Sequence, residues 1–160
     1  MWLSLIIRKH TFGLCSFAYT FLQTMSQITI GQKAPDFSGI NQNGETISLQ
    51  DFAGKKLILY FYPKDNTPGC TIEAKNLNEN FEKLTKLGYV IIGVSPDSVQ
   101  SHCKFIASHG LQFNLIADTE KSILKTYNAW GEKKMYGKTY EGVLRTTYII
   151  DEQGIILSVI

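Results

Sequence analysis

The sequence has few cysteines, almost no excess charge and no apolar run long enough to cross a bilayer. Its three cysteines, Cys15, Cys70 and Cys103, are too few and too scattered for the disulfide framework of a small secreted domain. They also lack the C-x-x-C pairing and the histidine spacing of a zinc site. A reducing compartment is therefore expected, and a cytoplasmic location is the default interpretation.

The charge balance excludes one class of partner. Sixteen basic and 14 acidic residues give a formal net charge of +2, which is no electrostatic footprint for nucleic acid. Hydrophobic residues make up 44% of the chain and charged residues 19%, a composition typical of globular proteins and not of disordered ones. A length of 160 residues predicts one domain whose core needs no metal or disulfide.

The first 24 residues differ from the rest. They are rich in aromatic and aliphatic side chains, but Arg8, Lys9 and His10 interrupt them, and the longer apolar run (11–22) is too short to span a bilayer. A clear small-x-small cleavage site is lacking before Met25. We therefore expect residues 1–24 to be an N-terminal extension outside the fold, and residues 25–160 to be the domain. A secretory or organelle-targeting segment stays open as the alternative.

Hydrophobic patterns beyond Met25 predict alternating strands and helices. Continuous apolar runs rich in β-formers predict strands buried on both faces; they are 57–62, 89–95 and 113–118. Amphipathic or capped segments predict helices, which are 70–87, a second from Asp97 or Ser98 to His109, and a short third at 119–127. A turn at 42–44 predicts an N-terminal hairpin of 36–39 and 45–49, residues 131–142 form a polar hairpin-like loop, and 145–151 and 155–160 are final strands.

This order predicts an α/β protein with a thioredoxin-like fold. Its central sheet is expected to be mixed but mainly parallel, flanked by helices on both faces, with the last strand pair antiparallel. A sheet of this kind normally receives a closing C-terminal helix after the last strand. We expect that helix to be missing from this sequence and predict an apolar patch where it would pack.

One cysteine occupies an unusual place, in the stretch FYPKDNTPGC. Thr67 is a good N-cap, Pro68 suits the first helical position, and Cys70 then falls in the first turn. Free amide hydrogens and the positive end of the helix dipole favour an anion there, so the ionised thiolate should be stabilised. The loop follows a buried strand, at the edge of a parallel sheet where ligands usually bind.

A thiolate at a helix start has three familiar uses. Disulfide exchange requires a second cysteine three residues on, and that position is Glu73. Acyl transfer requires a histidine base, but His10 lies in the extension, and His102 and His109 are interpreted as a solvated helix face. Peroxide reduction needs only the thiolate, a hydroxyl to hold the peroxide and a cation for the leaving oxygen.

The motif Pro63-x-x-x-Thr67-x-x-Cys70 resembles the active-site motif of peroxiredoxins. Together with GQKAPDF, GVSPDS, NLIAD and YNAWGEKKMYGKTYEGVLRTTYIID, it is similar to the bacterioferritin comigratory protein subfamily from about Ile30 to Ile156. The resemblance implies a thiol-dependent peroxidase that reduces hydrogen peroxide and organic hydroperoxides and needs no metal, flavin or haem. It further implies recycling by thioredoxin or a similar dithiol donor, and a monomer.

The resemblance also assigns roles. Cys70 would be the peroxidatic cysteine, Thr67 would hold the peroxide, and Arg145 would stabilise the thiolate and the transition state. Pro63 and Pro68 would shape the pocket. Taken alone, Arg145 would be a surface charge at a strand end, and Glu73 is interpreted as a first-turn partner of the helix dipole.

The sequence departs from the subfamily at the resolving cysteine, which many members carry five residues after the peroxidatic one. That position is Lys75, so a disulfide within this helix is excluded. Cys103 in the following helix is the candidate resolving residue; the alternative is that it fills a core stripe with Val99 and Ile106. A one-cysteine cycle with an external thiol also stays open, and Cys15 is disfavoured.

A function of another class uses the same residue. On the same fold, oxidation of Cys70 would change a partner interaction, and the protein would be a peroxide-responsive sensor. Steady turnover with a thioredoxin system indicates the enzyme, whereas one stoichiometric oxidation indicates the sensor.

Overall fold

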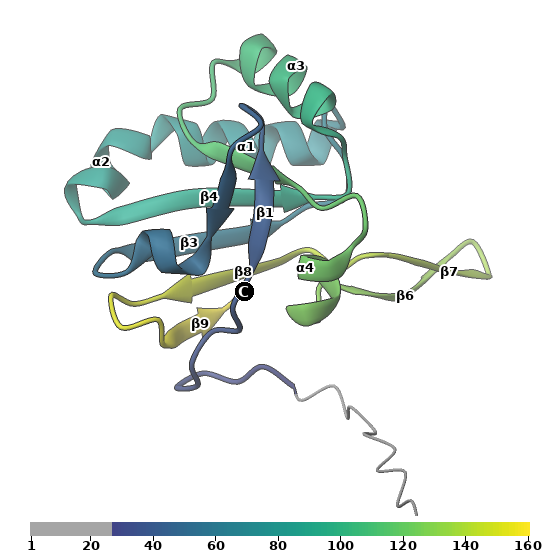
Figure 1. Ribbon diagram of the computed structural model, residues 1–160. Coiled ribbons are helices and arrows are strands. Elements are labelled where there is room, and N and C mark those ends of the chain that lie inside the picture. The colour runs from purple at the N-terminus through teal and green to yellow at the C-terminus, as the bar shows by residue number, and fades with distance from the viewer. Residues whose placement is uncertain (1–26) are drawn as a thin grey trace, which may run out of the picture.

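A seven-stranded sheet forms the centre of the computed structural model, which describes residues 27–160 (Figure 1). The strand order is β2-β1-β5-β4-β3-β8-β9. The strands of this sheet are β1 (Ser38–Asn41), β2 (Thr46–Ser48), β3 (Lys56–Phe61), β4 (Tyr89–Ser95), β5 (Asn114–Ala117), β8 (Thr146–Ile150) and β9 (Ile156–Val159). The expected extension, residues 1–24, lies outside the described residues.

Four α-helices and a separate hairpin complete the described part of the chain. The helices are α1 (Pro68–Glu79), α2 (Phe81–Lys86), α3 (Val99–His109) and α4 (Ser122–Thr126), and a 3-10 turn, η1, covers Leu49–Phe52. The hairpin consists of β6 (Trp130–Met135) and β7 (Lys138–Val143), and it projects away from the sheet (Figure 1). The polar loop expected there is thus an ordered antiparallel ribbon.

The sheet is mixed, as the sequence predicts, but its parallel part is small. β3 pairs in parallel with β4, and β4 with β5, whereas the other neighbours in the described sheet are antiparallel. The expectation of a mainly parallel sheet is therefore wrong. The reason is that hairpins supply both outer parts of the sheet, β1–β2 on one side and β8–β9 on the other, and hairpin partners run antiparallel.

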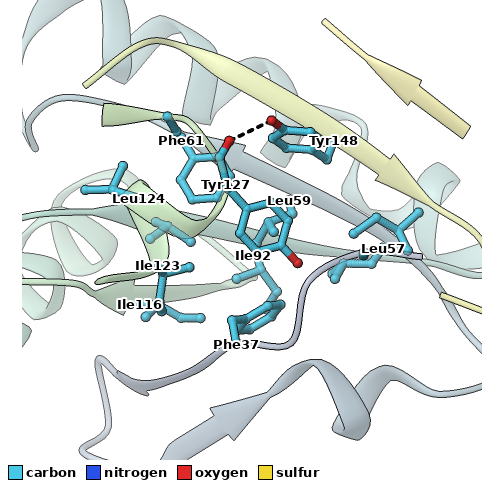
Figure 2. Close-up of a cluster of buried hydrophobic side chains, with 14 of the residues drawn as sticks. Phe37, Leu57, Leu59, Phe61, Ile92, Ile116, Ile123, Leu124, Tyr127 and Tyr148 are labelled. Atoms are coloured by element: carbon cyan, nitrogen blue, oxygen red, sulfur yellow. Dashed lines mark hydrogen bonds between the residues drawn. The ribbon is translucent and has the colours of Figure 1, made fainter. Parts of the chain in front are cut away.

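Alternate side chains of β3 enter two different cores. Leu57, Leu59 and Phe61 belong to one cluster with Ile123 and Leu124 of α4 and with the rings of Tyr127 and Tyr148, as Figure 2 shows. In that cluster the Tyr148 hydroxyl donates to the Tyr127 carbonyl at 2.7 Å. The intervening residues of β3 face α1 and α3 on the other side. The unbroken apolar run of the sequence reflects this burial on both faces.

The expected helix 70–87 is two helices. Asn80 interrupts it at φ −97° and ψ 5°, between α1 and α2. Its side-chain amide donates to the Asn76 carbonyl at 2.9 Å, the same oxygen that its own backbone N–H reaches at 3.4 Å. Asparagine side chains compete with the backbone in this way, and that competition ends α1 early.

The predicted ends of α3 agree with the structure. Ser98 caps α3 by accepting from the Ser101 N–H at 3.3 Å, and Gly110 ends it in the left-handed conformation at φ 60°. At the opposite edge of the sheet, Leu157, Val159 and Ile160 are exposed on and after β9. These exposed side chains lie near the last strand, where the sequence predicts an apolar patch.

Candidate active site

The loop between β3 and α1 carries the candidate motif. Pro63 is half-buried and follows the strand, and Thr67 is the N-cap residue of α1 by its extended backbone, φ −86° and ψ 149°. Its hydroxyl does not cap the helix, however; it donates to the Lys64 carbonyl at 3.1 Å. The first turn of α1 is thus left without a hydroxyl cap, and its free amide hydrogens favour an anion.

Cys70 lies in this first turn and is only 1% exposed. The Nη2 atom of Arg145 donates to its sulfur at 3.0 Å, from a position 75 residues later in the chain. Gly69 leaves room for this approach, because a Cβ atom there would lie 3.2 Å from the same Nη2 atom and would crowd it. The structure therefore directs a fixed positive charge at a buried thiol on a helix N-terminus.

Arg145 also pairs with Glu73, whose Oε2 atom accepts from Nη1 at 2.7 Å. Burial raises the pKa of Glu73, and the nearby guanidinium opposes that rise. The interpretation of Glu73 as a first-turn dipole partner is wrong, because the first turn of α1 holds no acidic residue and Glu73 lies beyond it. Its carboxylate instead holds one edge of the guanidinium while the other edge meets the sulfur.

Cys103 is an exposed residue of α3. Its thiol donates to the Gln42 carbonyl in the β1–β2 turn at 3.0 Å. The alternative that it fills a core stripe is wrong, since the buried stripe of α3 consists of His102 and Phe105, with Ile106 partly buried. Cys70 and Cys103 are both free thiols.

The interpretation of His102 as part of a solvated helix face is wrong, because this residue is completely buried. Its Nδ1 atom lies 2.9 Å from Oδ2 of Asp65, and its Nε2 atom lies 3.1 Å from the Ile116 carbonyl. Asp65 belongs to the loop that precedes Cys70. Sequence reasoning missed this pair because a polar residue on an amphipathic helix ordinarily faces water, and the two partners are 37 residues apart.

Burial acts to raise the pKa of Asp65, but hydrogen bonds from His102 and Ser101 outweigh it and hold that pKa below its ordinary value of 3.8. A carboxylate whose pKa is lower in the folded than in the unfolded protein stabilises the fold at pH values above its unfolded-state pKa. This stability is lost as the pH falls through the folded-state pKa. We expect Asp65→Asn to lower the free energy of unfolding by about 3 kcal/mol at pH 7, because it removes a buried carboxylate that the Tyr62, Ser101 and His102 side chains contact. Urea unfolding at pH 7 and pH 3 would measure this, and the difference between the two pH values should shrink in the variant.

The structure combines a thioredoxin-like sheet, a buried cysteine at a helix start and an arginine that donates a hydrogen bond to the cysteine sulfur. This combination is typical of thiol peroxidases. The chain belongs to the AhpC/TSA family, whose model matches residues 30–159. This confirms the family and the enzymatic class that the motif predicts.

Curated relatives and solved structures agree with the assignment. The chain is 47% identical over 132 residues to the putative peroxiredoxin bcp of Helicobacter pylori, covering 82% of this chain and 87% of that protein. It is 48% identical over 127 residues to peroxiredoxin Bcp of Bacillus subtilis, covering 79% and 81%. Its fold is similar to that of the Xanthomonas campestris bacterioferritin comigratory protein, studied for alkyl peroxide reduction, with a TM-score of 0.74, 35% identity and coverage of 78% and 79%.

A mutant of Xylella fastidiosa PrxQ gives a TM-score of 0.78 at 31% identity, covering 84% of this chain and 86% of that one. The protein is thus a peroxiredoxin of the Bcp/PrxQ type, an oxidoreductase that reduces peroxides with a thiol. Within residues 27–160, every helix is too short or too polar to cross a membrane.

Proposed function

We propose that Cys70 is the peroxidatic cysteine of this peroxidase. The observation that carries the proposal is the 3.0 Å contact between the Arg145 guanidinium and the buried sulfur, at the N-terminus of α1. The thiolate attacks the terminal oxygen of a hydroperoxide, so that an S–O bond forms while the O–O bond breaks. Sulfur gives up two electrons, the leaving oxygen takes a proton, and the products are Cys70 sulfenic acid and an alcohol or water.

The neighbouring residues have supporting roles in this step. Arg145 stabilises the negative charge that develops on the leaving oxygen, as a fixed donor does in other enzymes. Thr67, three residues before Cys70, holds the peroxide; its hydroxyl proton is directed at Lys64, and its oxygen still accepts a hydrogen bond from the peroxide O–H. Pro63 and Pro68 shape the entrance and limit the access of water.

Recycling uses a second thiol, for which we propose Cys103. Its exposed sulfur attacks Cys70 sulfenic acid, forming a disulfide and releasing water, and thioredoxin or a similar dithiol donor then reduces the bond. Because the Cys70 sulfur is buried and Cys103 is exposed, the start of α1 must open to uncover the Cys70 sulfur before the disulfide can form. We further propose that the protein acts as a monomer in the cytoplasm, where its thiols stay reduced.

Mutation of Cys103 tests the recycling route. We expect Cys103→Ser to leave the rate of Cys70 oxidation unchanged, but to lower steady turnover with thioredoxin by roughly tenfold or more, because an intramolecular thiol has a high effective concentration. Mass spectrometry after one equivalent of hydrogen peroxide should find a Cys70–Cys103 disulfide in the parent protein. A lasting sulfenic acid at Cys70, with Cys103 still free, would show that the cycle uses one cysteine and an external thiol.

A further inference from the structure

A buried polar cluster fastens the loop before Cys70 to the helix that carries Cys103. The carboxylate of Asp65 accepts hydrogen bonds from the Tyr62 hydroxyl at 2.7 Å and from the Ser101 hydroxyl at 2.6 Å. His102 contacts the same carboxylate at 2.9 Å. Asp65 is 4% exposed and His102 is 0% exposed, so water contributes little to this cluster.

Both ring nitrogens of His102 have an oxygen partner. Its Nδ1 atom faces the Asp65 carboxylate, and its Nε2 atom faces the Ile116 carbonyl, which is also an acceptor. The Tyr62 hydroxyl, 3.4 Å from Nδ1, already gives its proton to Asp65. Each ring nitrogen thus lies within hydrogen-bond distance of an oxygen, so the imidazole is held between the Cys70 loop and β5.

The backbone of the loop is fixed at the same residue. The Asp65 N–H donates to Oδ2 of Asp97 at 2.8 Å, and the Ser95 hydroxyl donates to that same oxygen at 2.8 Å. The next residue, Asn66, takes the left-handed conformation at φ 56°. Asp65 is thus anchored through both its backbone and its side chain to β4 and α3, five residues before the reactive sulfur.

This anchor matters because the two halves of the catalytic cycle need different access to Cys70. A peroxide is small enough to reach a sulfur that is 1% exposed, whereas a thiol on another residue or another protein is not. Once Cys70 sulfenic acid has formed, the closed loop therefore favours its reaction with a second peroxide. An open loop favours its reaction with a thiol. The stability of the anchor determines which reaction is faster.

We propose that Asp65 and His102 are positioning residues whose buried, hydrogen-bonded contact holds the Cys70 loop closed and so sets how the sulfenic acid divides between thiol and peroxide. The inference rests on the proposed role of Cys70. In the closed state a second hydroperoxide oxidises the sulfenic acid to sulfinic acid, losing its O–O bond and leaving an alcohol or water. In the open state a thiol attacks the sulfur, forming a disulfide and releasing water.

The test measures both reactions in one protein. We expect His102→Gln to increase the rate at which a bulky monothiol, the tripeptide glutathione, reacts with Cys70 sulfenic acid by about tenfold, because a less stable closed state opens more often. The hydrogen peroxide concentration that converts half of Cys70 to sulfinic acid should rise by a similar factor. Stopped-flow mixing and mass spectrometry of Cys70 measure the two quantities, in a Cys103→Ser background that removes the internal thiol.

Two further variants separate the effect of the Asp65–His102 contact from a general loss of stability. Phe105→Leu is the matched control, because Phe105 is buried in the same helix and packs 6.2 Å from the Tyr62 ring without a polar atom to offer Asp65. If its melting temperature equals that of His102→Gln, Phe105→Leu should leave the thiol reaction rate within about twofold of the parent value. The same holds for the hydrogen peroxide concentration that converts half of Cys70. Tyr62→Phe removes one donor to Asp65 and keeps the ring, so it tests the cluster even if His102→Gln fails to fold.

A double-mutant comparison completes the test. If the pair acts as a unit, Asp65→Asn combined with His102→Gln should change the partition no more than the larger single effect. Equal shifts in Phe105→Leu and His102→Gln, or a rise in sulfinic acid when the pair is broken, would overturn the proposal. Formation of sulfenic acid in a Cys70→Ser variant would instead overturn the proposed function, so the two failures are distinct.

Discussion

Replacement of Cys70 by serine is expected to lower peroxide consumption by at least about a thousandfold, because a serine hydroxyl stays protonated where the thiolate is the nucleophile. The substitution changes one atom in a site that is 1% exposed, so the loop, α1 and the Arg145 guanidinium should keep their places. The assay is peroxide consumption with a thioredoxin system, followed by trapping of sulfenic acid with dimedone. Both signals should disappear.

Cys103→Ser is the matched control, since it also removes one thiol but leaves the buried sulfur intact. It should still form one equivalent of sulfenic acid per chain in a single turnover. Substantial peroxide consumption by Cys70→Ser would move the reactive thiol elsewhere in the chain. Loss of the single turnover in Cys103→Ser would make Cys103, and not Cys70, the residue that peroxide attacks first.

The elements that the sequence predicts well are those whose signals are local. The apolar run of β3 needs no partner to indicate burial on both faces, and its side chains do divide between two cores. Ser98 and Gly110 mark the ends of α3 by their own backbone and side-chain chemistry. The position of Cys70 in the first turn of α1 follows in the same way from Thr67 and Pro68.

The features that sequence reasoning missed depend on partners distant in the chain. Asp65 and His102 are 37 residues apart, and each looks like a surface residue until the other is placed beside it. The exposure of Cys103 follows from the rotation of α3, which turns His102 and Phe105 inward and leaves the two residues between them, Cys103 and Lys104, outside. The extent of antiparallel pairing likewise depends on which strands meet at the edges of the sheet.

The role of Arg145 follows from the resemblance to a known family and not from residue spacing. Residue spacing alone predicts an anion site at Cys70, but it would leave Arg145 as a surface charge at a strand end. The resemblance to peroxiredoxins selected it, and the structure places its guanidinium on the sulfur from a position just before β8. Neither route predicted that Glu73 holds the other edge of the guanidinium.

Replacement of Arg145 by glutamine is expected to lower the second-order rate constant for Cys70 oxidation by roughly 10²–10³-fold, the usual cost of losing one fixed donor to developing charge. The guanidinium meets the sulfur at 3.0 Å and so stabilises both the thiolate and the oxygen that leaves. The loss should be the same at every concentration of thiol reductant, because only the first step involves this charge. Stopped-flow mixing of reduced protein with hydrogen peroxide measures it directly.

Three variants decide whether geometry or charge alone is responsible. Lys104→Gln removes an exposed cation from α3 with the same change in net charge and should leave the rate constant unaltered. Arg145→Lys keeps the charge but lacks the planar fork that reaches Cys70 and Glu73 together, so its rate should fall between those of the parent and Arg145→Gln. Glu73→Gln should cost less than Arg145→Gln, because the guanidinium keeps a neutral acceptor. If Arg145→Lys matched the parent, a positive charge anywhere near the sulfur would suffice, and the two-edged contact would have no catalytic meaning.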